Sequence, residues 1–94
     1  MLTGRLDTMG ALRHTPAGVP ALEFRVAHVS TQIEAGLPRR VSVSMPCLAM
    51  GTPASAVSRL ALGSGLRLEG FLAQRTAASS QVILHVTGAS PEAA

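Results

Sequence analysis

The chain has 94 residues, of which 47% are hydrophobic and 14% charged, a length that fits one domain. No apolar run approaches the ~20 residues that cross a bilayer, and the single Cys47 excludes an internal disulfide and a zinc site built on paired cysteines. Eight basic residues, all arginine, against five acidic ones give a net charge of +3, a weak indication of an anionic partner.

The N-terminal residues do not have the pattern of an export signal. Arg5 and Asp7 stand where a signal peptide has its apolar core. A single reduced thiol is also compatible with a reducing compartment. We therefore expect a cytoplasmic protein with no membrane partner.

Five segments alternate apolar and polar residues with the two-residue period of a β-strand. In chain order they are residues 2–7, 22–27, 40–45, 66–73 and 82–87. Each segment therefore has one face for a core and one polar face. Five short strands of this kind predict a small barrel or sandwich.

Turn-forming residues separate the five segments. Gly and Pro fall within residues 15–20, 35–38, 51–53 and 63–65, and small residues fill positions 77–80. Gly adopts positive φ without strain and Pro lacks a backbone N–H, so both end strands.

Residues 54–62 break the strand pattern. Val57, Leu60 and Ala61 have helical spacing there, which predicts either one helical turn or an irregular loop that inserts apolar side chains into the core. A longer connection between the third and fourth of five strands is the layout of the OB-fold, a partly open Greek-key barrel.

Two glycines fit such a barrel. Gly4 and Gly70 lie inside predicted strands, where Gly often marks a bulge or a tight bend. We therefore expect an all-β, five-stranded OB-fold domain over residues 1–88. Residues 89–94 have too little apolar surface to order themselves and are expected to form a disordered tail.

No pattern predicts a metal site, a cofactor or a catalytic group. His14, His28 and His85 lie in different segments, so no local spacing marks them as metal ligands, and hydrogen-bonded structural roles are expected. Cys47 lies in an apolar run and is expected to be a small buried residue. We expect a binding protein, not an enzyme.

The face and loops of an OB-fold commonly bind oligonucleotides, and six arginines are candidate contacts for a single strand, which needs cations along its phosphates and flat side chains for its bases. The alternative for each is a solvated strand face or a cross-strand ion pair, as for Arg25 beside Glu23. The candidates are Arg39, Arg40, Arg75, Arg13, Arg25 and Arg67.

The apolar run at residues 45–50 exceeds what one strand face can bury, and exposed apolar surface is typical of an interface. A twofold homodimer is the commonest oligomer. The candidate interface residues are Met45, Leu48, Met50 and Phe71. Burial of Phe71 in a core or interface is preferred to base stacking, and Phe24 is expected in the core.

Short motifs follow one another in a fixed order over nearly the whole chain. They include LTG at residues 2–4, TPAGVP at residues 15–20, QIEAG at residues 32–36, SMP at residues 44–46, GF at residues 70–71 and VILH at residues 82–85. Together they resemble the primosomal replication protein N (PriB) family. The resemblance implies a homodimeric OB-fold that binds single-stranded DNA, acts with other primosome proteins in replication restart, and couples to the PriA helicase. It implies no cofactor.

The sequence departs from that family at the expected DNA contacts. Leu37 and Ser42 stand where an aromatic residue is usual, and residues 76–81 lack the usual lysines. Stacking of a base on an aromatic side chain contributes ~1–3 kcal/mol, so we expect weaker DNA binding than the family norm. The alternatives are an OB-fold protein-interaction module with little DNA binding and an OB-fold RNA-binding protein.

Overall fold

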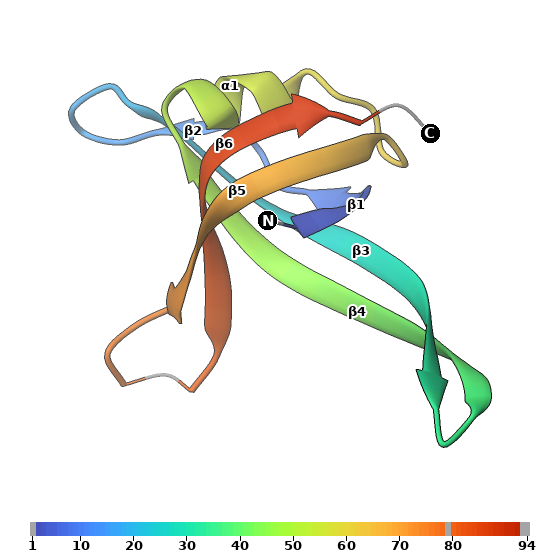
Figure 1. Cartoon of the computed structure of the whole chain (residues 1–94). Helices are drawn as coiled ribbons and strands as arrows, with labels where there is room; N and C mark the ends of the chain where they lie inside the picture. The colour runs from blue at the N-terminus through green and yellow to red at the C-terminus, as the bar shows by residue number, and fades with distance from the viewer. Residues whose placement is uncertain (1, 79, 93–94) are drawn as a thin grey trace.

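The structure is a computed structural model that describes residues 2–78 and 80–92, without the side chains of residues 29–34, 39 and 41. Within these described residues, six strands and one short helix follow one another (Figure 1). They are β1 (Leu2–Met9), β2 (Arg13–His14), β3 (Pro20–Glu34), β4 (Leu37–Met50), α1 (Thr52–Ser58), β5 (Gly65–Gln74) and β6 (Val82–Pro91).

The strands form a single sheet that closes on itself. Their order is β1-β5-β6-β4-β3-β2, and an additional pairing of β1 with β3 closes the five long strands into a barrel. β4 and β6 run parallel, whereas the other pairs are antiparallel. This arrangement confirms the predicted OB-fold. The two-residue β2 is too short to show an alternating pattern in the sequence.

The β3–β4 hairpin continues past the barrel as an arm (Figure 1). These strands have 15 and 14 residues, far more than the alternating segments predicted within them. Ala35 and Gly36 connect them with φ angles of 51° and 77°. Positive φ at both central residues is the geometry of the two-residue turn that matches the twist of a hairpin.

Two glycines lie where strands bend or approach one another closely, and the predicted bulge is confirmed at Gly70 but not at Gly4. The register of β5 against β6 shifts between Glu69 and Gly70, and a Cβ atom at Gly70 would overlap the carbonyl oxygen of His85. A Cβ atom at Gly4 would lie only 2.5 Å from the carbonyl oxygen of Ala27. Gly70 therefore marks a bulge, whereas Gly4 marks a close contact between strands.

The helix α1 closes one end of the barrel and confirms the helical alternative for this connection. It begins at Thr52 and ends at Ser58, whereas the spacing predicted residues 54–62. Pro53 stands in the first turn, where proline favours the start of a helix. Ala54 and Val57 are fully buried in the core, and Phe24 is buried with them, as expected. Among the described residues, no helix is long and apolar enough to cross a membrane.

The predicted start of a disordered tail at residue 89 needs a correction. β6 continues to Pro91, and Ala89 packs against the core. Backbone pairing with β5 orders this segment without large apolar side chains, because Ala89 pairs with Leu68 and Pro91 with Leu66. The last two residues of the predicted tail, 93–94, lie outside the described residues.

Candidate nucleic-acid interface

One row of side chains crosses four neighbouring strands on the outside of the barrel. On β3, Glu23 pairs with Leu48 of β4. Leu48 pairs with His85 of β6, and His85 pairs with Phe71 of β5. Paired residues of neighbouring strands point to the same face of a sheet. We call Phe71, His85, Leu48 and Glu23 the outer row, because the residues next to them in β3, β4 and β6 are buried.

Two rings of the outer row form a flat platform. The centroids of the Phe71 and His85 rings lie 5.1 Å apart, and the ring planes differ by 4°. Phe71 is 57% exposed, which excludes the predicted core position within this chain. Among the described pairs, β1 accompanies β5 only from Gly65 to Leu68, so the side of the Phe71 ring away from His85 has no neighbouring strand.

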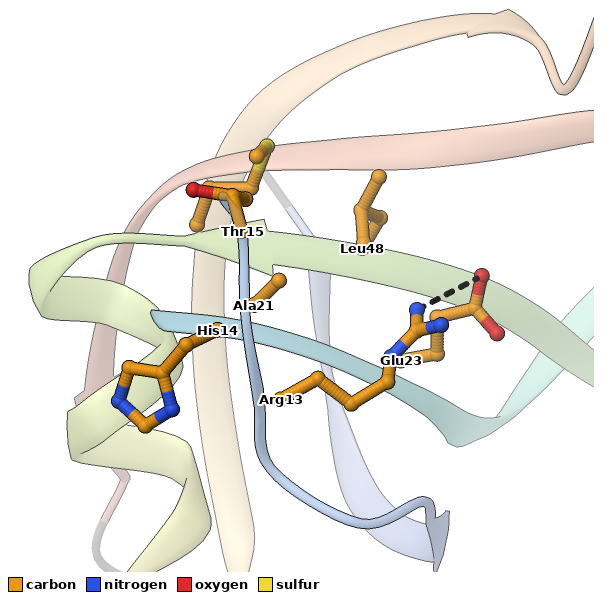
Figure 2. A pocket seen from close by; sticks show the side chains of 7 residues that line it. Arg13, His14, Thr15, Ala21, Glu23 and Leu48 are labelled. Atoms are coloured by element: carbon orange, nitrogen blue, oxygen red, sulfur yellow. Dashed lines mark ion pairs between the residues drawn. The ribbon is translucent and has the colours of Figure 1, made fainter. Parts of the chain in front are cut away.

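Two arginines meet one carboxylate at the other end of the outer row. The Nη1 atom of Arg75 donates a hydrogen bond of 3.2 Å to Oε1 of Glu23. The Nη2 atom of Arg13 lies 4.0 Å from the same oxygen, and a dashed line in Figure 2 marks this ion pair. Arg13 comes from β2, whereas Arg75 opens the loop to β6, which its backbone N–H closes with a hydrogen bond to Gln81. Glu23 therefore connects β2 with the loop between β5 and β6.

Two open hollows lie beside Glu23. The Arg13 hollow has a volume of about 300 Å³ and is lined by Arg13, Leu48 and Met50 together with Glu23 (Figure 2). The Arg25 hollow has a volume of about 190 Å³ and is lined by Arg25 and Arg75, again with Glu23. Glu23 thus lines two hollows that each carry a cation.

The six candidate arginines do not all meet. Arg13, Arg25 and Arg75 line the two hollows. Arg40 pairs with Thr31 on the β3–β4 arm, and Arg67 of β5 lies opposite Ser90 of β6. Neither arginine lines the Arg13 hollow or the Arg25 hollow. The side chain of Arg39 lies outside the described part of the chain, although its backbone belongs to β4.

The four candidate interface residues fall on two faces. Leu48, Met50 and Phe71 lie on the outside of the barrel, where the first two line the Arg13 hollow. Met45 instead packs against the core and lines an apolar hollow of about 230 Å³. We call this the Met45 hollow; the exposed Leu72 also lines it.

His28 and Cys47 have structural environments. The Nδ1 atom of His28 lies 2.6 Å from the carbonyl oxygen of Thr3, which can only accept, so Nδ1 carries the proton. Cys47 is 1% exposed, and burial raises the pKa of its thiol to about 12 although Arg25 opposes the rise. A protonated thiol is a poor nucleophile. Within the described residues, no three His, Cys, Asp or Glu side chains gather to hold a metal ion.

Sequence reasoning missed Glu23 and His85 as members of this site. Neither has a local motif, and the contact from Glu23 to Arg75 spans 52 positions of the chain. Only the strand register brings these side chains together.

Comparisons with known proteins agree with this fold. The family described as "another single-strand binding protein family" matches residues 1–88. The replication restart protein PriB of Bordetella pertussis is 42% identical over 85 residues, which cover 90% of this chain and 79% of that protein. Its counterpart from Nitrosomonas europaea is 34% identical over 86 residues, which cover 92% of this chain and 80% of that protein.

Solved structures show the same arrangement. The PriB structure from Ralstonia solanacearum superposes with a TM-score of 0.80 at 32% identity, covering 97% of this chain and 93% of that one. The single-stranded DNA binding protein of Thermus aquaticus gives a TM-score of 0.78 at 21% identity, covering 97% of this chain and 48% of that one. The latter likeness concerns the fold alone.

Proposed function

Because the chain belongs to the family of single-strand binding proteins that includes the PriB replication restart proteins, we propose that it binds single-stranded DNA in replication restart. The outer row and the two hollows beside it form the binding face. The observation that carries this proposal is the exposed stack of Phe71 on His85 on the same face as three arginines.

The chemistry of this face matches a single strand. Bases stack on flat side chains, and arginine guanidinium groups neutralise the phosphates between them. Phe71 supplies the flat surface, while Arg13 and Arg75 stand at the far end of the outer row. An unpaired strand can place a base on the ring and its phosphates near the arginines, whereas the bases of a duplex are already stacked.

The proposal includes weaker DNA binding than the family norm. Phe71 is the single exposed Phe, Tyr or Trp of this chain, since Phe24 is buried. The loop after Arg75 carries no charged residue from position 76 to position 81. Fewer stacking contacts lower the affinity. Fewer phosphate contacts lower both the affinity and its dependence on salt.

We also propose a cytoplasmic homodimer that couples to the PriA helicase, as the family resemblance implies. The Met45 hollow supports the dimer, because the exposed Leu72 beside it leaves apolar surface for a second copy to cover. Sedimentation at micromolar concentration is expected to give about twice the chain mass of 9.6 kDa, and a monomer would contradict the dimer. Coupling is expected to increase unwinding of a forked DNA by PriA.

Removal of both arginines that contact Glu23 tests the binding proposal. Arg13→Ala combined with Arg75→Ala is expected to lower the affinity for a labelled thymidine oligomer about three- to tenfold at 0.1 M salt. Each phosphate contact of a single strand contributes about −0.7 to the slope of log affinity against log salt, so that slope is expected to flatten by about 1.4. Fluorescence anisotropy measures both the affinity and the salt slope. The titrations cover roughly 50 to 200 mM salt, where the salt dependence of binding is large.

The matched control removes the same charge elsewhere. Arg5 donates to the carbonyl oxygen of Gly63, and Arg59 ends α1, so both lie away from the outer row. Arg5→Ala combined with Arg59→Ala should leave the slope nearly unchanged. Equal slopes for the two double variants would contradict the proposed face, and tighter binding of the matching RNA oligomer would favour an RNA-binding protein.

A further inference from the structure

Glu23 occupies the position on this face where a phosphate group would meet two arginines. Its Oε1 atom accepts a hydrogen bond from Arg75 at 3.2 Å and lies 4.0 Å from Arg13. Its side chain is 43% exposed, so it is accessible to a ligand in solution. Glu23 also lines both hollows, and its neighbour Leu48 on β4 brings no charge of its own.

We propose that Glu23 competes with DNA phosphates for Arg13 and Arg75, and thereby sets the affinity of this face for single strands. This inference rests on the proposed function. Carboxylate and phosphate oxygens are the two anionic partners that arginine forks bind in the same way. When DNA binds, phosphate oxygens replace Oε1 of Glu23 at the two guanidinium groups, and the carboxylate turns to solvent.

The geometry makes this exchange easy. An ion pair as exposed as that of Glu23 and Arg75 contributes little to folding, so its loss costs the fold little. While the carboxylate remains, it cancels one of the two arginine charges that a phosphate meets. The Glu23 side chain also lines both the Arg13 hollow and the Arg25 hollow, so a strand that displaces it has arginines on either side.

The Glu23→Gln variant tests the competition, because it keeps the size of the side chain and removes its charge. Its affinity for a thymidine oligomer at 0.1 M salt is expected to be about three- to tenfold higher than that of the parent, an advantage that shrinks at high salt. Circular dichroism and thermal unfolding of the variant should match those of the parent.

Glu92→Gln is the matched control. It changes the net charge by the same amount at the opposite end of β5, where the backbone N–H of Glu92 donates to Gly65. This variant should bind within twofold of the parent. If the parent binds DNA and Glu23→Gln binds no tighter than Glu92→Gln, the inference is wrong and the proposed function stands. If neither the parent nor Glu23→Gln binds, both are wrong.

A double-mutant cycle separates competition from plain repulsion. In the background of Arg13→Ala with Arg75→Ala, both arginines that Glu23 is proposed to compete for are gone, while Arg25 is unchanged. Addition of Glu23→Gln to this background is therefore expected to raise the affinity less than twofold. A gain as large as in the parent would mean that the carboxylate repels DNA directly, and would overturn the competition.

Discussion

Replacement of Phe71 with alanine is expected to weaken binding of a thymidine oligomer about ten- to a hundredfold, with the protein still folded. Loss of one aromatic stacking platform costs ~1–3 kcal/mol per base. Phe71 is the ring that can supply it, because it is 57% exposed and held parallel to His85. Because the side chain is exposed, its truncation removes little core packing. The substitution should therefore lower the DNA affinity and leave the stability of the fold nearly unchanged.

Two further substitutions show whether stacking is the cause. Phe71→Tyr keeps a flat ring and should bind within about threefold of the parent, whereas Phe71→Leu keeps an apolar side chain and should bind nearly as weakly as Phe71→Ala. Leu62 is 62% exposed in the loop before β5, so Leu62→Ala controls for loss of exposed apolar area. Equal binding by the Tyr and Leu variants would contradict a stacking role for Phe71.

The stability of the fold is expected to fall steeply above pH 9 because of Cys47 alone. Burial raises the pKa of its thiol from 9.0 to about 12, which corresponds to about 4 kcal/mol. Below pH 9 the thiol is protonated in both the folded and unfolded chain. Between pH 9 and 12 the unfolded chain loses this proton and the folded chain keeps it, so the free energy of unfolding decreases as the pH rises.

The composition of the chain makes this measurement clean. It contains no Lys and no Tyr, the other residue types whose ordinary pKa lies between about 9 and 12. Urea unfolding should show that the free energy of unfolding decreases strongly from pH 8 to pH 11 for the parent and only slightly for Cys47→Ala. The variant should be somewhat less stable at pH 8, because it loses a buried sulfur atom. An equal alkaline loss in both proteins would contradict the assignment to Cys47.

Local patterns in the sequence were enough to predict the barrel. Alternation fixes which side chains of a strand face inwards, and it placed Phe24 in the core correctly. Gly70 was correctly linked to a bulge, because a side chain there would meet the neighbouring strand. The PriB resemblance is also confirmed by the matches to known proteins.

The candidate site could be predicted only in part, because it depends on contacts between distant segments. Alternation showed that Arg25 faces outwards, but not that it shares a face with Arg13 and Arg75. The stack of Phe71 on His85 requires the register of β5 against β6, which shifts at the bulge. No local pattern specifies that register.

Backbone pairing also orders segments that side-chain patterns do not predict to be strands. Residues 89–91 look like a tail because they carry little apolar surface, yet their backbone groups pair with β5. Similarly, the arm formed by β3 and β4 extends past the alternating segments because the hairpin ladder continues to the turn at Ala35. A ladder of backbone hydrogen bonds needs no particular side chains.

Amide chemical-shift mapping by NMR during titration with a thymidine oligomer tests the outer row as the DNA site most directly. The largest shifts are expected at Phe71, His85 and Leu48, followed by Arg13 and Arg75. The amides of α1 should move little, since the helix lies at one end of the barrel (Figure 1). Shifts concentrated on α1 or around the Met45 hollow, with the outer row unchanged, would contradict this site.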